Sequence, residues 1–383
     1  MSNYPDYIDQ GEDVFDKYLE EEAQKIIQLI NSDEIQEYDR EIRKLRELLG
    51  LPETDVLTRF DELLGNELIG RTWLLEKIKA WVEDPHGSQI MMLYGKPGAG
   101  KSMFAAHLQM YEPHITAAFP CDCRSSEFSN TDSIIRNISY RLALRMPDYR
   151  SVLLNILKKR PNYSDENMLF NLLIATPLAK YNIDGDRGIQ IIIIDALDEM
   201  KNDHLAKFID QYAPMMKHYM RFLITSRKIP EITERFSSCS NIDIDTYIEA
   251  GKADLKDYYE KRLGEALSKY PEKDAFIQKL IDASDLMFAY AKCVCDNILA
   301  DIADNLFHIH EYPIPKGLDK LYTATLDRYF NSSHSQYTIR DYEEEWRDAL
   351  GMIAASPEPM PTSTLMKLCL LYTSPSSRDR SLS

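Results

Sequence analysis

The feature that most constrains this chain is an octapeptide at residues 95–102, which reads GKPGAGKS. It satisfies the pattern G-x-x-x-x-G-K-[ST], which forms a phosphate-binding loop (P-loop) when a strand precedes it and a helix follows. An apolar run at 89–94 stands before the octapeptide, and a helix-forming stretch at 103–110 stands after it. The flanking sequence meets that condition and predicts an α/β domain that binds a nucleotide through its phosphates.

The residue types in this loop each suit a chemical role. Glycine has no side chain, so the backbone of the loop can wrap closely around phosphate oxygens, while its N–H groups and the following helix supply partial positive charge. Lys101 is expected to reach the β- and γ-phosphates, and the hydroxyl of Ser102 to bind Mg²⁺. We predict ATP/ADP and Mg²⁺ as cofactors, although phosphate contacts do not separate ATP from GTP. The predicted nucleotide contacts of the loop are Gly95, Lys96, Pro97, Gly98, Ala99, Gly100, Lys101 and Ser102.

A second apolar run ends in a carboxylate. Residues 191–195 read IIIID, and unbroken β-branched runs are typical of a strand buried inside a parallel sheet. Ligands bind at the carboxyl edge of such a sheet, so Asp195 is predicted to bind Mg²⁺ together with Ser102. Of the two carboxylates that follow, Glu199 is predicted to orient or deprotonate the attacking water, with Asp198 beside it in the catalytic set. The alternative is that Asp198 and Glu199 only begin a helix.

A third polar cluster follows the run at 222–225, which reads FLIT and predicts another strand. Arg227 comes just after this run and therefore belongs to the same sheet edge as Asp195. Its guanidinium could contact the γ-phosphate there, stabilising developing charge or reporting its loss. The alternative is an arginine in a surface loop.

The order of helical and strand patterns defines the fold class. Strands are predicted at 89–94, 115–119, 189–194 and 222–225, with helices at 72–83, after Lys101 and between 132 and 174. This alternation indicates a mostly parallel sheet covered on both faces. After residue 247 only helical patterns occur, at 252–267, 273–283, 286–305, 318–329 and 342–354. We predict an α/β P-loop NTPase domain with a mostly parallel sheet, followed by an all-helical domain.

Charge and composition exclude several classes of partner. The formal net charge of -17 repels nucleic acid and anionic membranes, and no basic block with interleaved aromatic residues stands out. No apolar run is long enough to span a bilayer, and the first residues lack the basic and apolar parts of a signal peptide. Six cysteines without framework spacing are typical of a reducing compartment. We expect a cytoplasmic protein that binds neither nucleic acid nor membrane.

Taken together, these motifs resemble those of NACHT-type members of the STAND class of signal-transduction NTPases. The specific part of the resemblance is DALDE at 195–199, where a small residue and then an acidic pair follow the aspartate, together with TSR at 225–227. Upstream, LIGRTWLL at 68–75 is similar to the family's apolar-Gly-Arg segment, whose arginine, here Arg71, lies near the nucleotide. The resemblance covers about residues 67–368.

The resemblance continues downstream and implies a function. Residues 283–299 resemble the family's helical domain, and 315–322 the start of its winged-helix region, but SDLMF at 284–288 departs from the Gly-x-Pro that such proteins often carry near the adenine. Such proteins are switches, in which ADP holds a closed form and ATP opens a form that assembles into oligomers. Slow ATP hydrolysis would reset the state. The alternatives are an AAA+-like motor that acts on protein or nucleic acid, and a module that binds nucleotide without hydrolysing it.

We divide the chain into segments on this basis. They are a helical N-terminal region at 1–65, a NACHT P-loop domain at 66–247, a helical domain at 248–310, the start of a winged-helix region at 311–368, and a tail at 369–383. The N-terminal region is interpreted as a helical cap or as a module that binds a protein effector. The tail begins CLLYTS, the translation of TGT CTC TTA TAC ACA TCT, which resembles a transposase adapter used in sequencing libraries. We therefore exclude the tail from the fold and expect a C-terminal sensor beyond Leu368 in the natural protein.

Overall fold

The computed structural model describes residues 33–52, 60, 63, 67–122, 129–159, 165–180, 189–216 and 219–324. The chain forms two compact units, one of residues 1–54 and 139–182 and the other of residues 55–138 and 183–383. The structure thus groups 139–182 with the N-terminal region, whereas the division made from the sequence assigns them to the P-loop domain. The helix expected at 342–354 and the tail at 369–383 lie outside the described residues, and the segment boundaries remain predictions.

Helices joined by turns make up the described residues of the first unit, which also includes residues 139–145 at the end of α6 (Thr131–Arg145). Its other helices are α2 (Asp33–Leu49), α7 (Pro147–Leu157), α8 (Glu166–Phe170) and α9 (Thr176–Lys180), with a π-helical turn at Asn171–Ala175 between the last two. Pro147 begins α7, where a residue without an N–H leaves no hydrogen bond unmade. The carbonyl of Leu173, inside the π-helical turn, accepts a hydrogen bond of 2.6 Å from the buried hydroxyl of Tyr149.

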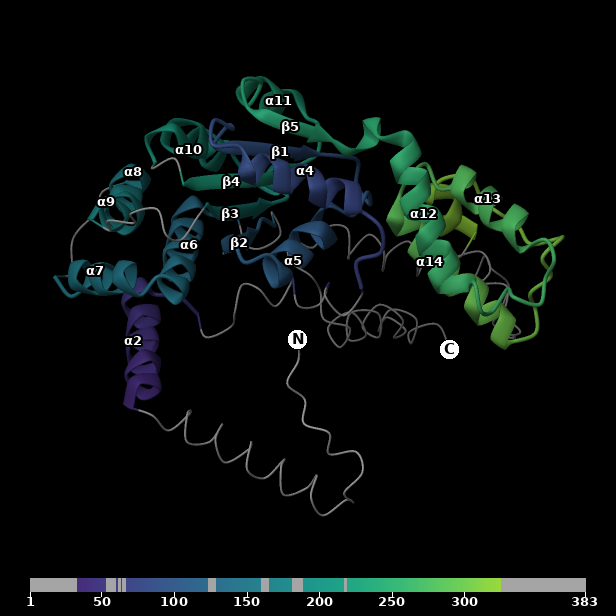
Figure 1. Cartoon of the computed structure of the whole chain (residues 1–383), viewed down its shortest axis with the longest axis horizontal. Helices are drawn as coiled ribbons and strands as arrows, with labels where there is room; N and C mark the ends of the chain where they lie inside the picture. Colours follow the sequence, from purple (N-terminus) through teal and green to yellow (C-terminus); the bar gives the residue numbers. More distant parts are fainter. Residues whose placement is uncertain are drawn as a thin grey trace, which may run out of the picture. The chain divides into compact units, whose positions relative to one another are not determined.

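The second unit contains a five-stranded parallel sheet in the order β2-β3-β4-β1-β5. The strands are β1 (Ile90–Tyr94), β2 (Ile115–Pro120), β3 (Gln190–Asp195), β4 (Met220–Ser226) and β5 (Ser240–Asp243). The first four confirm the predicted parallel sheet, and β5 was not predicted. Figure 1 shows β1 inside the sheet, between β4 and β5. The loop that follows β1 therefore emerges among the ends of several strands.

The sheet has buried side chains on both faces, as its unbroken apolar runs require, since successive residues of a strand point to opposite faces. One face packs against α4 (Thr72–Glu83) and α5 (Lys101–Tyr111). This core includes Leu74, Ile78, Trp81, Met91, Leu93, Phe104, Leu108, Ile193 and Leu223. On the opposite face Met92, Ile192 and Ile224 are also buried. This part of the chain also contains α10 (His204–Tyr212), α11 (Pro230–Arg235) and residues 131–138 at the start of α6 (Thr131–Arg145).

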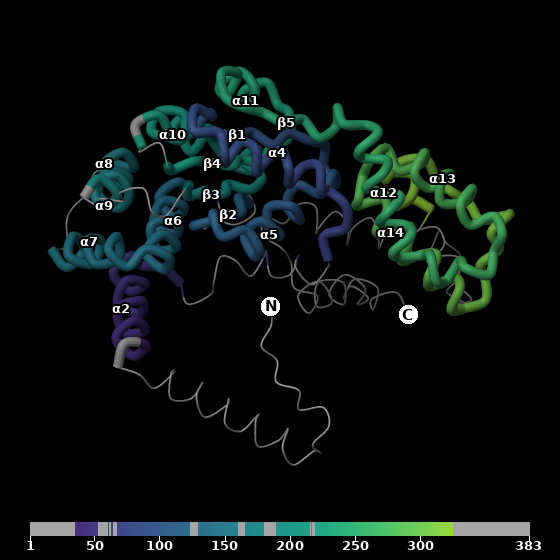
Figure 2. Tube along the Cα trace, in the orientation of Figure 1, coloured from purple at the N-terminus to yellow at the C-terminus, as the bar shows by residue number. Residues whose placement is uncertain are grey.

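A helical domain follows the sheet, as predicted, and its helices lie together in the trace of Figure 2. They are α12 (Ile248–Leu263), α13 (Lys273–Ala283) and α14 (Phe288–Ala303), packed around residues that include Leu255, Tyr259, Leu280 and Tyr290. The turn into α14 is left-handed at Asp285 and Leu286, with φ of 51° and 61°. Such a backbone is rare for leucine, so this turn is locally strained. In the described parts of the chain, no helix combines the length and the apolar character that crossing a membrane requires.

Candidate nucleotide site

The loop between β1 and α5 takes its shape from glycine. Gly98 and Gly100 have φ of 77° and 89°, a left-handed conformation that residues with a side chain rarely adopt. Gly100 is the N-cap of α5, and its carbonyl accepts the N–H of Phe104 at 3.0 Å. The first N–H groups of α5 have no partner within their own helix and carry the positive end of its dipole. The loop and this helix end together form an anion-binding element.

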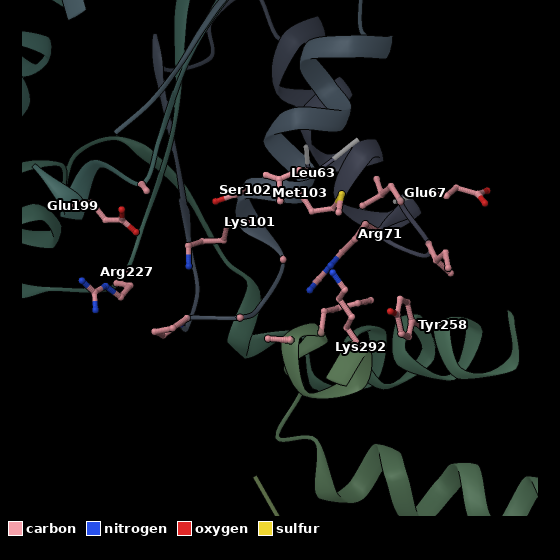
Figure 3. A pocket seen from close by; sticks show the side chains of 18 of the residues that line it. Leu63, Glu67, Arg71, Lys101, Ser102, Met103, Glu199, Arg227, Tyr258 and Lys292 are labelled. Carbon is pink, nitrogen blue, oxygen red and sulfur yellow. The ribbon is translucent and has the colours of Figure 1, made fainter. Parts of the chain in front are cut away.

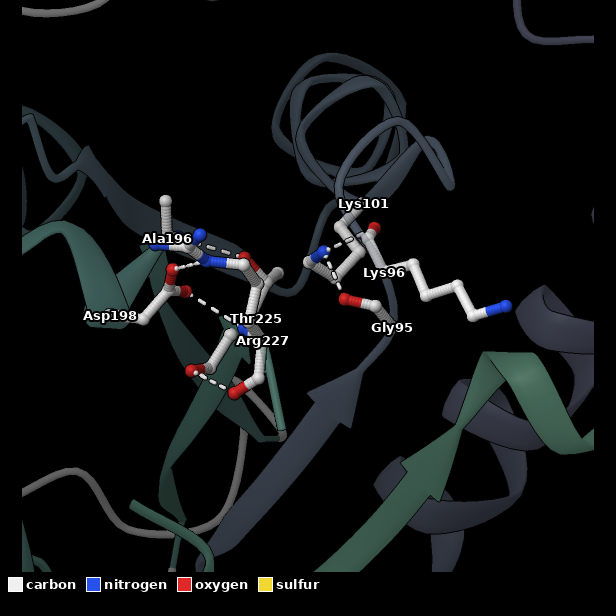
Figure 4. Close-up of polar contacts among 8 residues, drawn as sticks. Gly95, Lys96, Lys101, Ala196, Asp198, Thr225 and Arg227 are labelled. Atoms are coloured by element: carbon white, nitrogen blue, oxygen red, sulfur yellow. Dashed lines mark hydrogen bonds and ion pairs between the residues drawn. The ribbon is translucent and has the colours of Figure 1, made fainter. Parts of the chain in front are cut away.

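Lys101 is the first residue of α5, and its side chain turns back to this loop. Its Nζ donates hydrogen bonds to the carbonyls of Gly95 and Lys96, at 2.6 and 3.0 Å (Figure 4). Burial lowers the pKa of Lys101 from its usual 10.5, while the nearby carboxylates of Asp198 and Asp195 oppose that shift. The ammonium is held by carbonyls of its own loop, so a short side-chain movement would bring it to phosphate oxygens in the same loop.

The end of β4 lies between the P-loop and Asp195, because β4 separates β1 from β3. The hydroxyl of Thr225 donates to Oδ1 of Asp195 at 2.6 Å and accepts the N–H of Ala196 at 2.8 Å. Thr225 and Asp195 are fully buried. Ala196 has a left-handed backbone, with φ of 57°. Thr225 thus fixes the carboxylate of Asp195 and the turn that leads from β3 to Asp198.

Asp198 and Arg227 form a two-point contact (Figure 4). The backbone N–H of Arg227 donates to Oδ1 of Asp198 at 2.8 Å, and its Nε donates to Oδ2 at 2.5 Å. The side chain of Asp198 is 4% exposed and that of Arg227 is 50% exposed. Burial alone would raise the pKa of Asp198, but the hydrogen bonds and charge of Arg227 outweigh it and lower the pKa below its usual 3.8. Asp198 is therefore a carboxylate that holds Arg227.

These elements surround a cavity of about 670 Å³, a volume within the usual range for small-molecule sites. Figure 3 shows Glu199, Arg227 and Lys101 on one side of it and Arg71, Tyr258 and Lys292 on the other. Its wall also contains apolar side chains that suit a base. The lining residues are Leu63, Glu67, Leu68, Ile69, Arg71, Pro97, Gly98, Gly100, Lys101, Ser102, Met103, Ala196, Asp198, Glu199, Arg227, Tyr258, Phe288, Ala289 and Lys292.

The predicted site residues divide into two groups around this cavity. The first group lines it: Pro97, Gly98, Gly100, Lys101, Ser102, Arg71, Asp198, Glu199 and Arg227. The second group does not line the cavity and consists of Gly95, Lys96, Ala99 and Asp195. The carbonyls of Gly95 and Lys96 accept hydrogen bonds from Lys101, the carbonyl of Ala99 accepts one from Arg71, and the carboxylate of Asp195 accepts one from Thr225. Mg²⁺ prefers oxygen ligands, which the hydroxyl of Ser102 and the carboxylates of Asp195 and Asp198 near Lys101 can supply. These residues therefore fit a magnesium-nucleotide ligand.

Arg71 supports the P-loop from the side of the helical domain. Its Nη2 donates to the carbonyl of Ala99 at 2.6 Å, and its backbone N–H donates to Oδ1 of Asp254 at 2.8 Å. Trp73 Nε1 donates to the other oxygen of Asp254 at 2.9 Å. A Cβ at Gly70 would lie 2.7 Å from Oδ1 of Asp254, so only glycine allows this approach. Burial lowers the pKa of Arg71, and the charge of Asp254 opposes the shift.

The helical domain also touches the P-loop directly. The N–H of Ala289, in the first turn of α14, donates to the carbonyl of Gly98 at 3.1 Å. The guanidinium of Arg71 lies 4.9 Å from the ring centre of Phe288, and Lys96 Nζ lies 3.1 Å from a carboxylate oxygen of Asp285. Sequence reasoning did not identify the residues that the helical domain contributes, Asp254, Tyr258, Phe288, Ala289 and Lys292. Each lies far along the chain from the loop and carries no local motif.

Part of the chain is similar to a known family. The family described as "Nephrocystin 3, N-terminal" matches residues 71–227, which include the P-loop and the ends of β3 and β4. A search of curated proteins finds no match. The fold assignment itself follows from the strand order and the loop described above.

Solved structures with some similarity include the Drosophila ORC bound to DNA, with a TM-score of 0.41 and 10% identity, covering 79% of this chain and 81% of that chain. Two mutants of RuvB from Thermotoga maritima have TM-scores of 0.35 and 0.32, each with 11% identity. They cover 78% and 79% of this chain, and each match covers 82% of the RuvB chain.

Proposed function

We propose that this chain is an ATP-binding switch of NACHT/STAND type, in which slow hydrolysis of ATP to ADP controls conformation and self-association. The observation that carries the proposal is the hydrogen bond from Ala289 to the carbonyl of Gly98. It joins α14 to the loop that would hold the phosphates, so a nucleotide in that loop would bear directly on the position of the helical domain. A ligand can shift a conformational equilibrium only through such differential contacts.

Different residues in and beside the cavity would bind the phosphates, bind Mg²⁺ and promote hydrolysis. Lys101 and the loop N–H groups would hold the β- and γ-phosphates, and Ser102 and Asp195 would hold Mg²⁺, which neutralises phosphate charge when bound. Glu199, in the cavity wall, would orient the attacking water and accept its proton. Asp198 would act through Arg227, because both of its oxygens accept hydrogen bonds from that residue.

The first experiment asks whether the site binds nucleotide. Lys101→Ala should abolish ATP binding measured by calorimetry, because the loop loses its ammonium. Lys256→Ala is the matched control, since this lysine is 61% exposed and lies outside the cavity wall. Wild-type affinity for ATP in Lys101→Ala would show that the assignment of the site is wrong.

The second experiment separates a switch from other ATPases. The purified wild-type chain should carry ADP and turn over ATP well below ~1 s⁻¹, the lower end for ordinary enzymes. Glu199→Gln should still bind ATP but not hydrolyse it, and light scattering should then detect self-association. Fast turnover that protein or nucleic acid stimulates would favour an AAA+-like motor. Unchanged turnover in Glu199→Gln would remove Glu199 from the catalytic set.

A further inference from the structure

A lysine of the helical domain, Lys292, lies in the wall of the cavity. It comes four residues after Phe288 on α14, so the two side chains share one face of the helix. The ring of Phe288 lies 4.9 Å from the guanidinium of Arg71 and 5.6 Å, edge to face, from the ring of Tyr258. Figure 3 places Lys292 with Arg71 and Tyr258, across the cavity from Glu199. Lys292 therefore stands near the apolar end of the site.

The cations of the cavity wall differ in how they are held. Three of them already have partners: loop carbonyls for Lys101, Asp198 for Arg227, and the Ala99 carbonyl for Arg71. Lys292, by contrast, makes no hydrogen bond or ion pair with any residue that the structure describes. An ammonium has three donors and no acceptor, so its natural complement is an anionic oxygen.

We propose that Lys292 binds the α-phosphate of the bound adenine nucleotide, an inference that rests on the proposed function. Lys101 and the N–H groups of its loop would account for the β- and γ-phosphates on the far side of the cavity, and the apolar wall near Tyr258 suits the base. The α-phosphate connects these two parts of a nucleotide. Lys292 is therefore a binding residue, through which the helical domain contacts the phosphate nearest the ribose.

The test compares Lys292→Gln, Lys292→Arg and a control, Lys279→Gln, which removes an exposed lysine of α13 outside the cavity wall. Affinities for ATP, ADP, AMP and adenosine are measured by competition against a fluorescent ADP. Lys292→Gln should weaken ATP, ADP and AMP alike by roughly tenfold, the usual effect of losing one charged hydrogen bond, and leave adenosine unchanged. Lys292→Arg should recover most of the affinity, and Lys279→Gln should match the wild type.

Several results would overturn the assignment. Unchanged affinity of Lys292→Gln for all three nucleotides would do so, and so would an equal loss for adenosine, which has no phosphate. A loss for ATP and ADP without a loss for AMP would rule out the α-phosphate. Failure of the proposed function is distinguishable, because ATP would then bind equally to the wild type and to Lys101→Ala. Thermal unfolding of each variant confirms that it is folded.

Discussion

The carboxylate of Asp198 accepts hydrogen bonds from both the backbone and the side chain of Arg227, at 2.8 and 2.5 Å. This contact joins the segments that follow β3 and β4 beside the P-loop. Arg227 is thereby given a fixed direction while half of its side chain remains exposed. In the proposed function, an arginine held in this way would contact the γ-phosphate without first having to be ordered.

The pair should be energetically coupled. In a double-mutant cycle of Arg227→Ala and Asp198→Ala, urea unfolding should give a coupling energy of about 1 kcal/mol for the side-chain contact alone, because Asp198 is buried and alanine keeps the backbone N–H that donates to it. The exposed pair of Lys252 and Glu249 on α12 is the control, and its coupling should be close to zero. A coupling no larger than that of the control pair would contradict the proposed role of Asp198.

The same contact makes stability depend on pH. The pKa of Asp198 is lower in the folded protein than its ordinary 3.8, so the folded state binds fewer protons than the unfolded chain. The resulting stabilisation of the folded state is complete at pH values above the ordinary pKa of 3.8, and it is lost as the pH falls through the lower pKa of the folded state. The difference in unfolding free energy between wild type and Arg227→Ala should be constant near pH 7 and shrink below about pH 4. A difference that grows on acidification would reverse the assigned direction of the shift.

Thr225 should be costly to replace by valine. Thr225→Val keeps the shape but removes the donor to Asp195 and the acceptor for the N–H of Ala196, both buried, so unfolding free energy should fall by roughly 2 kcal/mol. Magnesium-dependent ATP binding should weaken as well, because the carboxylate loses its orientation. Thr233→Val removes a half-buried hydroxyl in α11 and should cost less than about 1 kcal/mol. Equal costs at the two positions would argue against a special role for Thr225.

Gly98 meets the helical domain at close range. A Cβ there would lie 2.9 Å from the Cβ of Ala289, so Gly98→Ala should push α14 away and weaken ATP binding. The unfolding free energy of Gly98→Ala should fall by more than the ~1 kcal/mol that a left-handed backbone costs a residue with a side chain. Gly317→Ala measures that backbone cost alone, because φ is 82° and nothing lies within 4 Å of a Cβ there.

A second substitution isolates the steric part of this effect. Adding Ala289→Gly to Gly98→Ala removes the atom that the new Cβ would meet. Because glycine in a helix is itself destabilising, the double variant is compared with Ala289→Gly alone. Relative to that variant, the added Gly98→Ala should cost only the backbone part that Gly317→Ala reports. If Gly98→Ala costs the same with and without Ala289→Gly, the contact between the P-loop and α14 is not what limits position 98.

Much of the sheet could be predicted because its signals are local. The loop at 95–102 and the run at 191–195 can each be recognised from consecutive residues alone. β5 gave no such signal, because only Ile242 of its four residues is buried. It belongs to the sheet through its pairing with β1, which no pattern within β5 reveals.

The candidate site was less predictable than the sheet. The contact between Arg71 and Asp254 joins residues that are 183 positions apart, and it depends on how α12 packs. The left-handed backbone of Ala196 gives no sign in the sequence, since alanine is not a residue that favours it. Lys292 reads as one more polar position of a helix until the cavity beside it is seen.

The strand order also affects how the chain folds while it is being synthesised. β1 pairs with β4 and β5, whose first residues are Met220 and Ser240. During synthesis the strand that precedes the P-loop therefore leaves the ribosome long before either of its neighbours exists. Pairing between distant segments is slow and leaves apolar strands open to aggregation in the meantime. A chaperone that shields nascent chains would have its greatest effect on this protein between the emergence of Tyr94 and that of Asp243.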